Sequence, residues 1–390
     1  MAEEKKNIPK LRFREFTGDN ANAWELRKLG RISDISTGKA FKSSEFDKSG
    51  EFLVVTNKEI SDSKFSNKVA GDRINISDDK ILNKYVLIGQ NILVTMDGVN
   101  IGKVGKYTNS KAVLAQRVGR VQSKQFDFVY AVLDNQKFVN KMNVLAVGNA
   151  IKHISLSQIS DYHFWLPICD VEQQKIGSFF RHLDELITLH QRMLDEYKTL
   201  KKTMLSKMFP KNGEKYPELR FSGFTDAWEL RKLGEVVKVY SGQDYKHLTR
   251  GEIPVYGTGG YMTSVNKALS YSEDAVGIGR KGTIDKPYIL SSPFWTVDTL
   301  FYAIPEEQYN LNFIYAIFKR IPWKKFDEST GVPSLSKKTI ANIVISTSNI
   351  DEQQKIGNFF RRLDELITLH QRELELLKTL KKTMLQQMFV

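Results

Sequence analysis

Two glycine-rich segments come closest to the loops that bind nucleotides. Residues 277–282 read GIGRKG, which has the G-x-G-x-x-G spacing of a dinucleotide-binding turn. Such a turn must open a helix, and Pro287 shortly after it opposes one. Residues 98–103 read GVNIGK, which is one residue too short between its glycines for a P-loop, and Val104 stands where Ser or Thr would hold magnesium. Both segments therefore indicate turns between strands.

Ionisable side chains give no stronger sign of catalysis. Two sets of two carboxylates and one lysine could hold a metal as in a nuclease, namely Asp170, Glu172 and Lys175, and Asp351, Glu352 and Lys355. Each set lies at the start of a predicted helix, which favours N-terminal capping and a favourable interaction with the helix dipole. We therefore predict no catalytic residues in this chain.

The histidines also lack the spacing of a metal site. They occupy positions 153, 163, 182, 190, 247 and 370, with no i, i+4 pair and no H-E-x-x-H motif. His190 and His370 stand at matching positions of a repeat, where a polar contact that sets the register between helices is favoured over a pH switch. The sequence predicts no metal centre.

A tandem repeat organises the elements that position these residues. Residues 172–205 return as residues 352–385 with 28 of 34 positions identical. The borders are repeated too, because 9–17 and 24–30 match 217–225 and 228–234. Trp24 and Trp228 in these borders are predicted to be packing anchors. The chain is thus a duplicated unit of lead-in, variable insert and shared helix.

The repeated segments have heptad spacing, which predicts two long helices. The apolar positions assigned to the first seam are Ile176, Phe179, Leu183, Leu186, Met193, Tyr197, Leu200 and Met204, with His190 among them. Glu373 interrupts the second seam. A helix of about 36 residues is roughly 54 Å long. So narrow an apolar stripe needs a partner, and the other copy is the simplest one.

The inserts between the helices are of ordinary domain size and rich in short β-type runs. We therefore expect an α+β protein with two globular α/β domains separated by two helices paired as an antiparallel, pseudo-twofold coiled coil. The predicted boundaries are 1–167 for the first domain with its lead-in, 168–209 for the first helix, 210–349 for the second domain with its lead-in, and 350–390 for the second helix.

Charge favours a polyanionic partner. Lys and Arg total 58 against 45 Asp and Glu, a net charge of +13. Cys169 is the only cysteine, so neither an intramolecular disulfide nor a cysteine-based zinc site is possible. No apolar run is long enough for a membrane span and no hydrophobic leader follows the first residues, so we expect a cytoplasmic protein.

Polar and basic side chains in predicted loops are the candidates for DNA contact, because Lys reaches phosphates while Asn, Gln and Arg reach base edges. For any single lysine a solvated surface is equally expected, and for any single tyrosine a core position. In the first insert the candidates are Lys39, Lys42, Ser43, Asn57, Lys58, Asn100, Lys103, Lys106, Arg117 and Lys152. In the second insert they are Tyr240, Gln243, Tyr245, Lys246, His247, Tyr256, Thr258, Tyr261, Arg280, Lys281, Ser334 and Lys337.

The chain as a whole resembles the specificity subunit of type I restriction-modification systems. The paired EQQKIG helices and WELRKLG borders carry the resemblance, with the turns GKVG at 102–105 and GRKGTI at 279–284 and the SLS triplets at 155–157 and 334–336. The resemblance implies a non-catalytic subunit in which each domain reads half of a bipartite DNA target, while the helices set the gap between the halves and dock the methyltransferase subunits. It also implies partners: two modification (methyltransferase) subunits using S-adenosylmethionine and, in complexes that also restrict DNA, restriction (translocase and nuclease) subunits using ATP and Mg²⁺.

A second set of apolar side chains lies beside the predicted seam and widens the apolar surface of the helices. These residues either thicken the helix core or receive helices from methyltransferase subunits, and we expect a mixture. They are Phe180, Ile187, Leu194, Phe360, Ile367 and Leu374.

Two other functions remain open at this point. The chain could be a coiled-coil protein with two ligand-binding heads that never touches DNA, which the salt dependence of duplex binding would distinguish. It could also be a DNA-modifying enzyme, although no N-P-P-F or D-P-P-Y motif occurs in it. Methyl transfer by the purified chain alone would support that reading.

Overall fold

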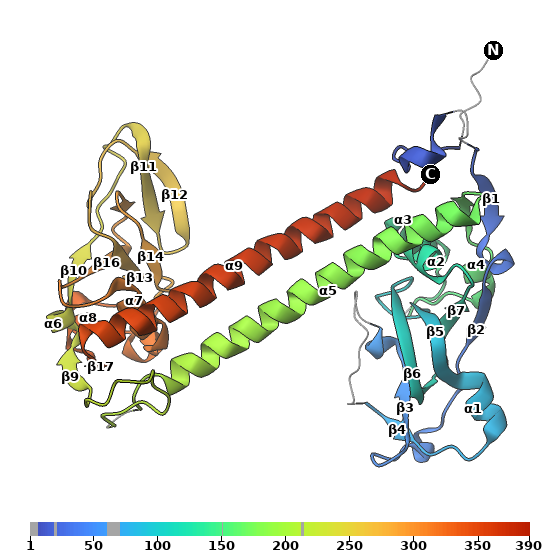
Figure 1. Ribbon diagram of the computed structural model, residues 1–390, viewed down its shortest axis with the longest axis horizontal. Helices are drawn as coiled ribbons and strands as arrows, with labels where there is room; N and C mark the ends of the chain where they lie inside the picture. The colour runs from blue at the N-terminus through green and yellow to red at the C-terminus, as the bar shows by residue number, and fades with distance from the viewer. Residues whose placement is uncertain (1–6, 19–21, 61–70, 150, 212–213) are drawn as a thin grey trace. The chain divides into compact units, whose positions relative to one another are not determined.

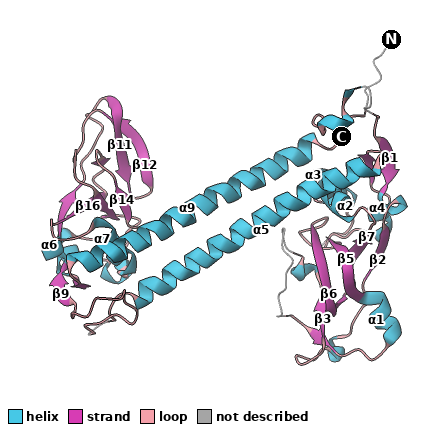
Figure 2. Cartoon of the chain, in the orientation of Figure 1, coloured by secondary structure: helices cyan, strands magenta, loops and turns pink. Residues whose placement is uncertain are grey.

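The computed structural model describes residues 7–18, 22–60, 71–149, 151–211 and 214–390. The chain forms two compact units, one from residues 1–192 with 371–390 and the other from residues 193–370. Each unit holds one globular head and one end of each long helix. The heads are residues 25–166 and 229–347 (Figures 1 and 2).

The first head is built around a six-stranded sheet of order β2-β7-β5-β6-β3-β4, in which only the β3–β6 pair is parallel. A separate antiparallel pair, β1–β8, joins the two ends of the head. The strands are β1 (Glu25–Lys28), β2 (Asp34–Thr37), β3 (Phe52–Val55), β4 (Arg73–Ile74), β5 (Val86–Thr95), β6 (Val104–Leu114), β7 (Val118–Gln122) and β8 (His163–Leu166). The helices are α1 (Asp79–Tyr85), α2 (Phe126–Leu133), α3 (Gln136–Leu145) and α4 (Leu156–Ser160).

The second head has a four-stranded sheet, β10-β16-β13-β14, and a three-stranded sheet, β12-β11-β15. The pair β9–β17 closes it as β1–β8 closes the first head. The strands are β9 (Glu229–Lys232), β10 (Val237–Ser241), β11 (Arg250–Gly257), β12 (Gly260–Val265), β13 (Ala275–Gly279), β14 (Tyr288–Leu290), β15 (Trp295–Thr296), β16 (Leu300–Pro305) and β17 (Val344–Thr347). The helices are α6 (Leu233–Val236), α7 (Leu311–Arg320) and α8 (Lys337–Asn342).

The repeated segments form the long helices α5 (Asp170–Lys207) and α9 (Ile350–Gln387), which are paired antiparallel (Figure 1). In the first unit Lys381 of α9 contacts Asp184 of α5, with 2.5 Å between Nζ and Oδ1. In the second unit Lys201 of α5 contacts Asp364 of α9, which is the same pair displaced by one repeat. The predicted α+β architecture with paired helices is confirmed.

The buried stripe of the first helix agrees with one row of the predicted seam, since Ile176 and Leu183 are 1% and 6% exposed, and differs in the other row. Leu186 and Leu200, assigned to that seam, are 42% and 37% exposed. Ile187 and Leu194, assigned to the flank, are 5% and 4% exposed. The stripe instead includes Lys201 and Lys381, whose ammonium groups are held by carboxylates. Lysine at a buried heptad position led to the wrong prediction for this row, because its polarity alone indicates a surface residue.

Both heads pack against the end of the helix from the other repeat. The C-terminal residues Met388 and Phe389 of the chain lie in the core of the first head, with the Trp24 and Phe389 ring centroids 6.2 Å apart. Met208 and Phe209 lie likewise in the core of the second head, where Phe209 is 5.7 Å from Trp228. Both tryptophans are therefore packing anchors, as predicted.

The lead-ins are fastened to the helix starts by buried ion pairs. Arg12 donates two hydrogen bonds to Glu172, at 2.6 and 2.7 Å, and both side chains are at least nine-tenths buried. Arg220 binds Glu352 in the same way at 2.7 and 2.8 Å. The prediction that these glutamates act through capping and the helix dipole was therefore incomplete, because their carboxylates bind arginines 160 and 132 positions away.

Within the described residues, no helix combines the length and apolarity needed to cross a membrane.

Candidate nucleic-acid interface

In the first head, the turn between β5 and β6 is tied to the segment before α4. Asp97 forms an isolated antiparallel bridge with His153. The backbone N–H of Gly98 donates to the carbonyl of Lys152 at 3.1 Å. Gly98 has φ of +83°, a conformation that costs a side-chain-bearing residue free energy. The conformation of the turn is therefore held by backbone bonds and does not depend on which side chains it carries.

The second head contains the same arrangement after β13. Lys281 forms a bridge with Ser334, and the N–H of Gly282, at φ of +93°, donates to the carbonyl of Pro333 at 2.8 Å. One position further along, Leu335 N–H donates to the Arg280 carbonyl at 2.9 Å. In the first head Ile154 and Met96 make that bond at 2.8 Å. Asp97 and Lys281 thus hold equivalent positions, as do His153 and Ser334.

Equivalent backbones carry different side chains at these turns. We name the two groups the first turn cluster, which consists of Asn57, Asp97, Arg117, Lys152 and His153, and the second turn cluster, which consists of Gln243, Thr258, Arg280, Lys281 and Ser334. Asp97 and His153 were not among the predicted contact residues, although an acid before a turn glycine is visible in the sequence DGVN. A single sequence offers no sign that Asp97 matches Lys281, since the bond pattern defines the match.

Three side chains of the first turn cluster combine donors with an acceptor. The Asn57 amide donates to Asp97 Oδ1, and Arg117 Nη1 lies 3.8 Å from Asp97 Oδ2. Arg117 is exposed and has φ of +68°, which is uncommon outside glycine. Asn and Arg side chains can bond adenine and guanine edges, and a carboxylate can accept from cytosine N4. The cluster has the chemical range that base reading requires.

The second turn cluster carries more positive charge. Arg280 lies over the Phe301 ring, 5.8 Å from its centroid, and its Nη1 donates to the carbonyl of Asp298 at 3.3 Å. Exposed Gln243 is positioned by its backbone, since its N–H donates to the Thr296 carbonyl at 2.8 Å. A Cβ placed on Gly282 would lie 4.0 Å from Thr258 Oγ1, so Thr258 adjoins the turn.

Tyrosines of the second head fall into structural and exposed groups. Tyr288 donates to the Gly257 carbonyl at 2.6 Å, and burial raises the pKa of its hydroxyl. Tyr256 packs between Tyr261 and Tyr288, and Tyr240 stacks on Tyr302 at 5.2 Å. Tyr261, at the β11–β12 turn, is 64% exposed. Tyr261 is therefore the tyrosine best placed to meet a ligand among those predicted.

Other predicted contact residues lie outside the turn clusters. His247 meets Trp295 edge-on at 6.1 Å, and Tyr245 packs against the core around that tryptophan. The backbone of Lys39 forms an isolated parallel bridge with Ala115. The remaining predicted positions, exposed except for half-buried Lys103, are Lys42, Ser43, Lys58, Asn100, Lys103, Lys246 and Lys337. Within this set, the backbone N–H of Lys103 donates to the Asn100 carbonyl at 3.1 Å in the β5–β6 turn.

Lys106 does not project from a loop. It lies on β6, with Nζ 3.0 Å from Asp127 Oδ1, 3.8 Å from Asp184 Oδ2 and 4.5 Å from the Tyr130 ring centroid. Because its charge is taken up by carboxylates beside α5, we withdraw it from the DNA-contact set. The GKVG segment that contains its neighbours enters β6 and is not the counterpart of GRKGTI.

Five of the six side chains considered for partner docking are buried within the chain. Phe180 and Phe360 are part of the cores of the two heads. Ile187, Leu194 and Leu374 are 4–5% exposed, and Ile367 is half-buried. Their burial favours the alternative in which they thicken the helix core, because a buried side chain offers little surface to a partner.

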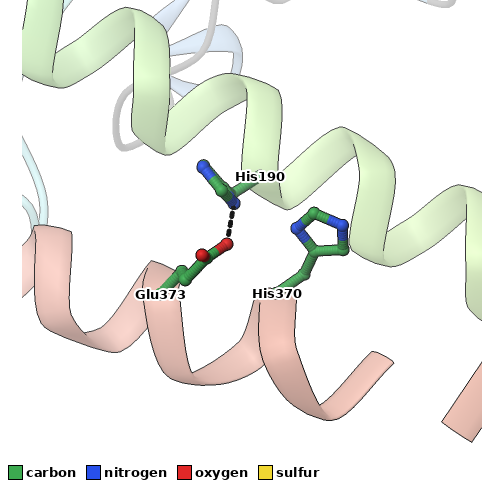
Figure 3. A group of neighbouring side chains, drawn as sticks. All are labelled: His190, His370 and Glu373. Atoms are coloured by element: carbon green, nitrogen blue, oxygen red, sulfur yellow. Dashed lines mark ion pairs between the residues drawn. The ribbon is translucent and has the colours of Figure 1, made fainter. Parts of the chain in front are cut away.

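The repeated histidines make polar or aromatic contacts on the helices. His190 Nδ1 lies 2.9 Å from a Glu373 carboxylate oxygen, an ion pair between α5 and α9 in the first unit (Figure 3). In the second unit the His370 ring stacks on Tyr197, with 5.5 Å between centroids. The contact of His190 agrees with the predicted polar contact between helices.

Comparison with known proteins places the chain in a family. The family model described as "Type I restriction modification DNA specificity domain" matches residues 22–199 and 225–379. The MjaVIII type I specificity subunit of Methanocaldococcus jannaschii is 21% identical over 346 residues, covering 78% of this chain and 79% of the relative. The putative MjaX specificity subunit of the same organism is 21% identical, covering 97% of this chain and 95% of the relative.

A solved structure shows the same fold. The crystal structure of a type I restriction-modification S subunit from M. genitalium has a TM-score of 0.73 at 19% identity, covering 98% of this chain and 99% of that one. Since the family model spans both heads and most of both helices, the chain belongs to the type I restriction-modification specificity subunits, the non-catalytic, DNA-binding members of these complexes.

Proposed function

We propose that each head reads one half of a bipartite duplex target through its turn cluster, and that α5 and α9 set the gap between the halves. The observation that carries the proposal is the shared backbone of the two turns, bonded alike but bearing Asp97 in one head and Lys281 in the other. Two turns with the same backbone hydrogen bonds but different side chains suit domains that recognise different base sequences. Direct readout depends on such side chains, because each base pair has its own donor and acceptor pattern in the major groove.

The test is to change one turn cluster at a time in the complete complex and to sequence the modified sites. Gln243→Ala and Lys281→Ala should relax the sequence preference only in the half read by the second head, at a cost of about 1–3 kcal/mol for each lost base contact. Asn57→Ala and Arg117→Ala should relax the other half. If each change weakens both halves equally, or neither, the assignment of one head to one half is wrong.

The proposal extends to partners on the helices. Leu189 and Leu369 hold equivalent positions in the two repeats and are 40% and 48% exposed. Equal exposed apolar positions on equal helices suit two copies of one partner, and we assign that partner as the modification subunit. S-adenosylmethionine is then bound by those subunits, and ATP with Mg²⁺ by restriction subunits where these join. Leu189→Asp and Leu369→Asp should each reduce the number of modification subunits recovered with a folded chain, while retention of both with either variant would refute this docking site.

A receptor for an uncharged ligand is the alternative function. DNA binding that releases counterions falls steeply with salt, whereas binding of an uncharged ligand does not. The net charge of +13 favours a DNA-binding function over this alternative.

A further inference from the structure

The second unit contains an open pocket with a strong excess of positive charge, which we call the basic pocket. It has a volume of about 550 Å³ and lies where the end of α5 meets α7 and α9. Its charged lining consists of Lys198, Lys201, Lys202, Lys319, Arg320 and Asp364. Among the lining residues that the structure describes, five cations thus face one carboxylate.

The first unit provides an internal reference for this pocket. Gly177 of α5 approaches the backbone nitrogen of Phe128, and Gly357 of α9 approaches that of Phe313. These contacts align α2 with α7, so that Asp134 corresponds to Lys319 and Asn135 to Arg320. The repeat aligns Lys381 with Lys201 and Asp184 with Asp364. The two sites can therefore be compared position by position.

In the first unit the buried lysine is neutralised. Lys381 Nζ lies 2.5 Å from Asp134 and 2.5 Å from Asp184, and 5.8 Å from the Tyr130 ring centroid. Burial acts to lower the pKa of Lys381, but the two carboxylates outweigh it and the pKa is raised. Asp184 also lies 3.8 Å from Lys106, whose other carboxylate is Asp127, so two ammonium groups share three carboxylates here and the site needs no further anion.

The second unit repeats this geometry with the charge of one member reversed. Lys201 keeps its ion pair with Asp364 and lies 5.8 Å from the Tyr315 ring centroid. Lys319, in place of Asp134, lies 5.6 Å from the same ring. The pKa of Lys319 is lowered, mainly by partial desolvation and to a smaller extent by the charge of Lys201. Two ammonium groups thus share the environment of a single carboxylate.

Arg320 adds a fixed charge beside them. Its guanidinium stacks on Phe209, 4.6 Å from the centroid, and Nη2 donates to the Pro210 carbonyl at 3.4 Å. Just beyond α7, Lys324 Nζ lies 2.9 Å from Asp285, which closely follows the second turn cluster in the chain. The end of α7 is thereby linked to the segment that carries Arg280 and Lys281.

We propose that the basic pocket binds backbone phosphates of duplex DNA next to the half-site contacted by the second head. The inference rests on the proposed function and adds a sequence-independent phosphate site that the first unit lacks at the equivalent position. Lysines serve as point charges for phosphate oxygens, and each phosphate they neutralise releases counterions. An anion seated between Lys201, Lys319 and Arg320 supplies the negative charge that Asp134 supplies in the first unit.

The test measures DNA affinity against salt concentration for the full chain with its modification subunits. The pair Lys198→Gln and Lys202→Gln has a matched control in Lys378→Gln and Lys382→Gln, the same exposed positions of the other repeat. Losing two phosphate contacts should make the log-log slope shallower by about 1.8, equally on duplexes of two unrelated sequences. The control pair should leave the slope unchanged. Lys319→Asp, which copies the residue that the first unit carries, should also make the slope shallower.

The outcomes separate this inference from the function on which it rests. Normal DNA binding by the wild type with unchanged slopes in all variants overturns the basic pocket alone, whereas absence of duplex binding by the wild type overturns both. If inorganic phosphate raises the melting temperature of the wild type but not of Lys319→Asp, while the DNA slopes stay equal, the site holds a small phosphate and the DNA assignment fails. If the variants lose modification subunits while their DNA slopes stay unchanged, the pocket binds acidic groups of a protein partner, and this result too would refute the proposed phosphate site.

Discussion

The buried ion pairs at the helix starts allow a prediction in which the two repeats act as each other's reference. The Glu352 carboxylate accepts three hydrogen bonds, two from Arg220 and one from Trp228 Nε1 at 3.1 Å. Glu172 accepts two from Arg12, and the indole nitrogen of Trp24 is buried without a hydrogen-bond partner among the described residues. Removing either carboxylate should destabilise its unit, and removing that of Glu352 should have the larger effect.

The magnitude follows from burial and from the number of bonds. The carboxylates of Glu172 and Glu352 are 1% and 0% exposed. Removing one partner of such a pair leaves an uncompensated buried arginine, which costs about 3–5 kcal/mol. The bond from Trp228 adds roughly 1 kcal/mol. Glu352→Gln should therefore lower the free energy of unfolding of its unit by about 1 kcal/mol more than Glu172→Gln lowers that of the other.

Hydrogen exchange measured by mass spectrometry resolves the two units in one experiment. Glu352→Gln should speed exchange in residues 214–232 and at the start of α9, and Glu172→Gln in residues 7–18 and at the start of α5. Glu185→Gln and Glu365→Gln are the controls, because among the described residues these exposed glutamates form ion pairs with Arg181 and Arg361 on their own helices. Such pairs are worth about 0.3–0.5 kcal/mol. If the lead-in of the Glu352→Gln variant exchanges no faster than that of the Glu365→Gln variant, the buried Arg220–Glu352 ion pair does not stabilise its unit and the prediction is wrong.

Two further perturbations have defined outcomes. Burial raises the pKa values of Tyr162 and Tyr315 from 10.0 to about 12, so the unfolded chain loses these protons first as pH rises. The contribution of these tyrosines to stability should be constant below pH 10 and should be lost between about pH 10 and 12. Over that range the urea midpoint of Tyr315→Phe should therefore fall less than that of the wild type. An equal fall in both proteins would contradict the effect of burial. In Gly98→Val the new side chain meets no neighbouring atom, but φ of +83° is unfavourable for a β-branched residue. The substitution should therefore cost at least about 1–2 kcal/mol of stability and weaken modification through the first half-site. Thermal unfolding unchanged from the wild type would show that the turn tolerates another conformation.

The sequence predicted the architecture because the repeat is nearly identical and its heptads are long. It predicted only one of the two rows of the buried stripe, because Ile176 and Leu183 are buried whereas Leu186 and Leu200 are not. An apolar Leu200 beside a charged Lys201 indicates the wrong face unless the carboxylate of Asp364 is known to lie opposite. Residue type reports intrinsic polarity, whereas the partner that makes burial favourable comes from another element.

The turn clusters were predicted in part for the same reason. Asn57, Arg117, Gln243 and Lys281 were identified by their type and by their glycine-rich surroundings. Lys106 belonged to the same pattern in sequence, yet its position on β6 points it at carboxylates beside α5. Pairing between distant segments, such as residues 97 and 153, decides which loop residues meet.

Lengthening both helices tests the central claim most directly. One additional heptad after Arg192 in α5 and one after Arg372 in α9 fall at equivalent positions of the repeats, so the antiparallel register is kept. Seven residues add about 10.5 Å of helix, close to three base pairs of duplex. Sequencing of modified bases in cells carrying this variant should find both half-sites unchanged and the gap between them longer by about three base pairs. An unchanged gap, or altered half-sites, would contradict the account of two readers held apart by a helical spacer.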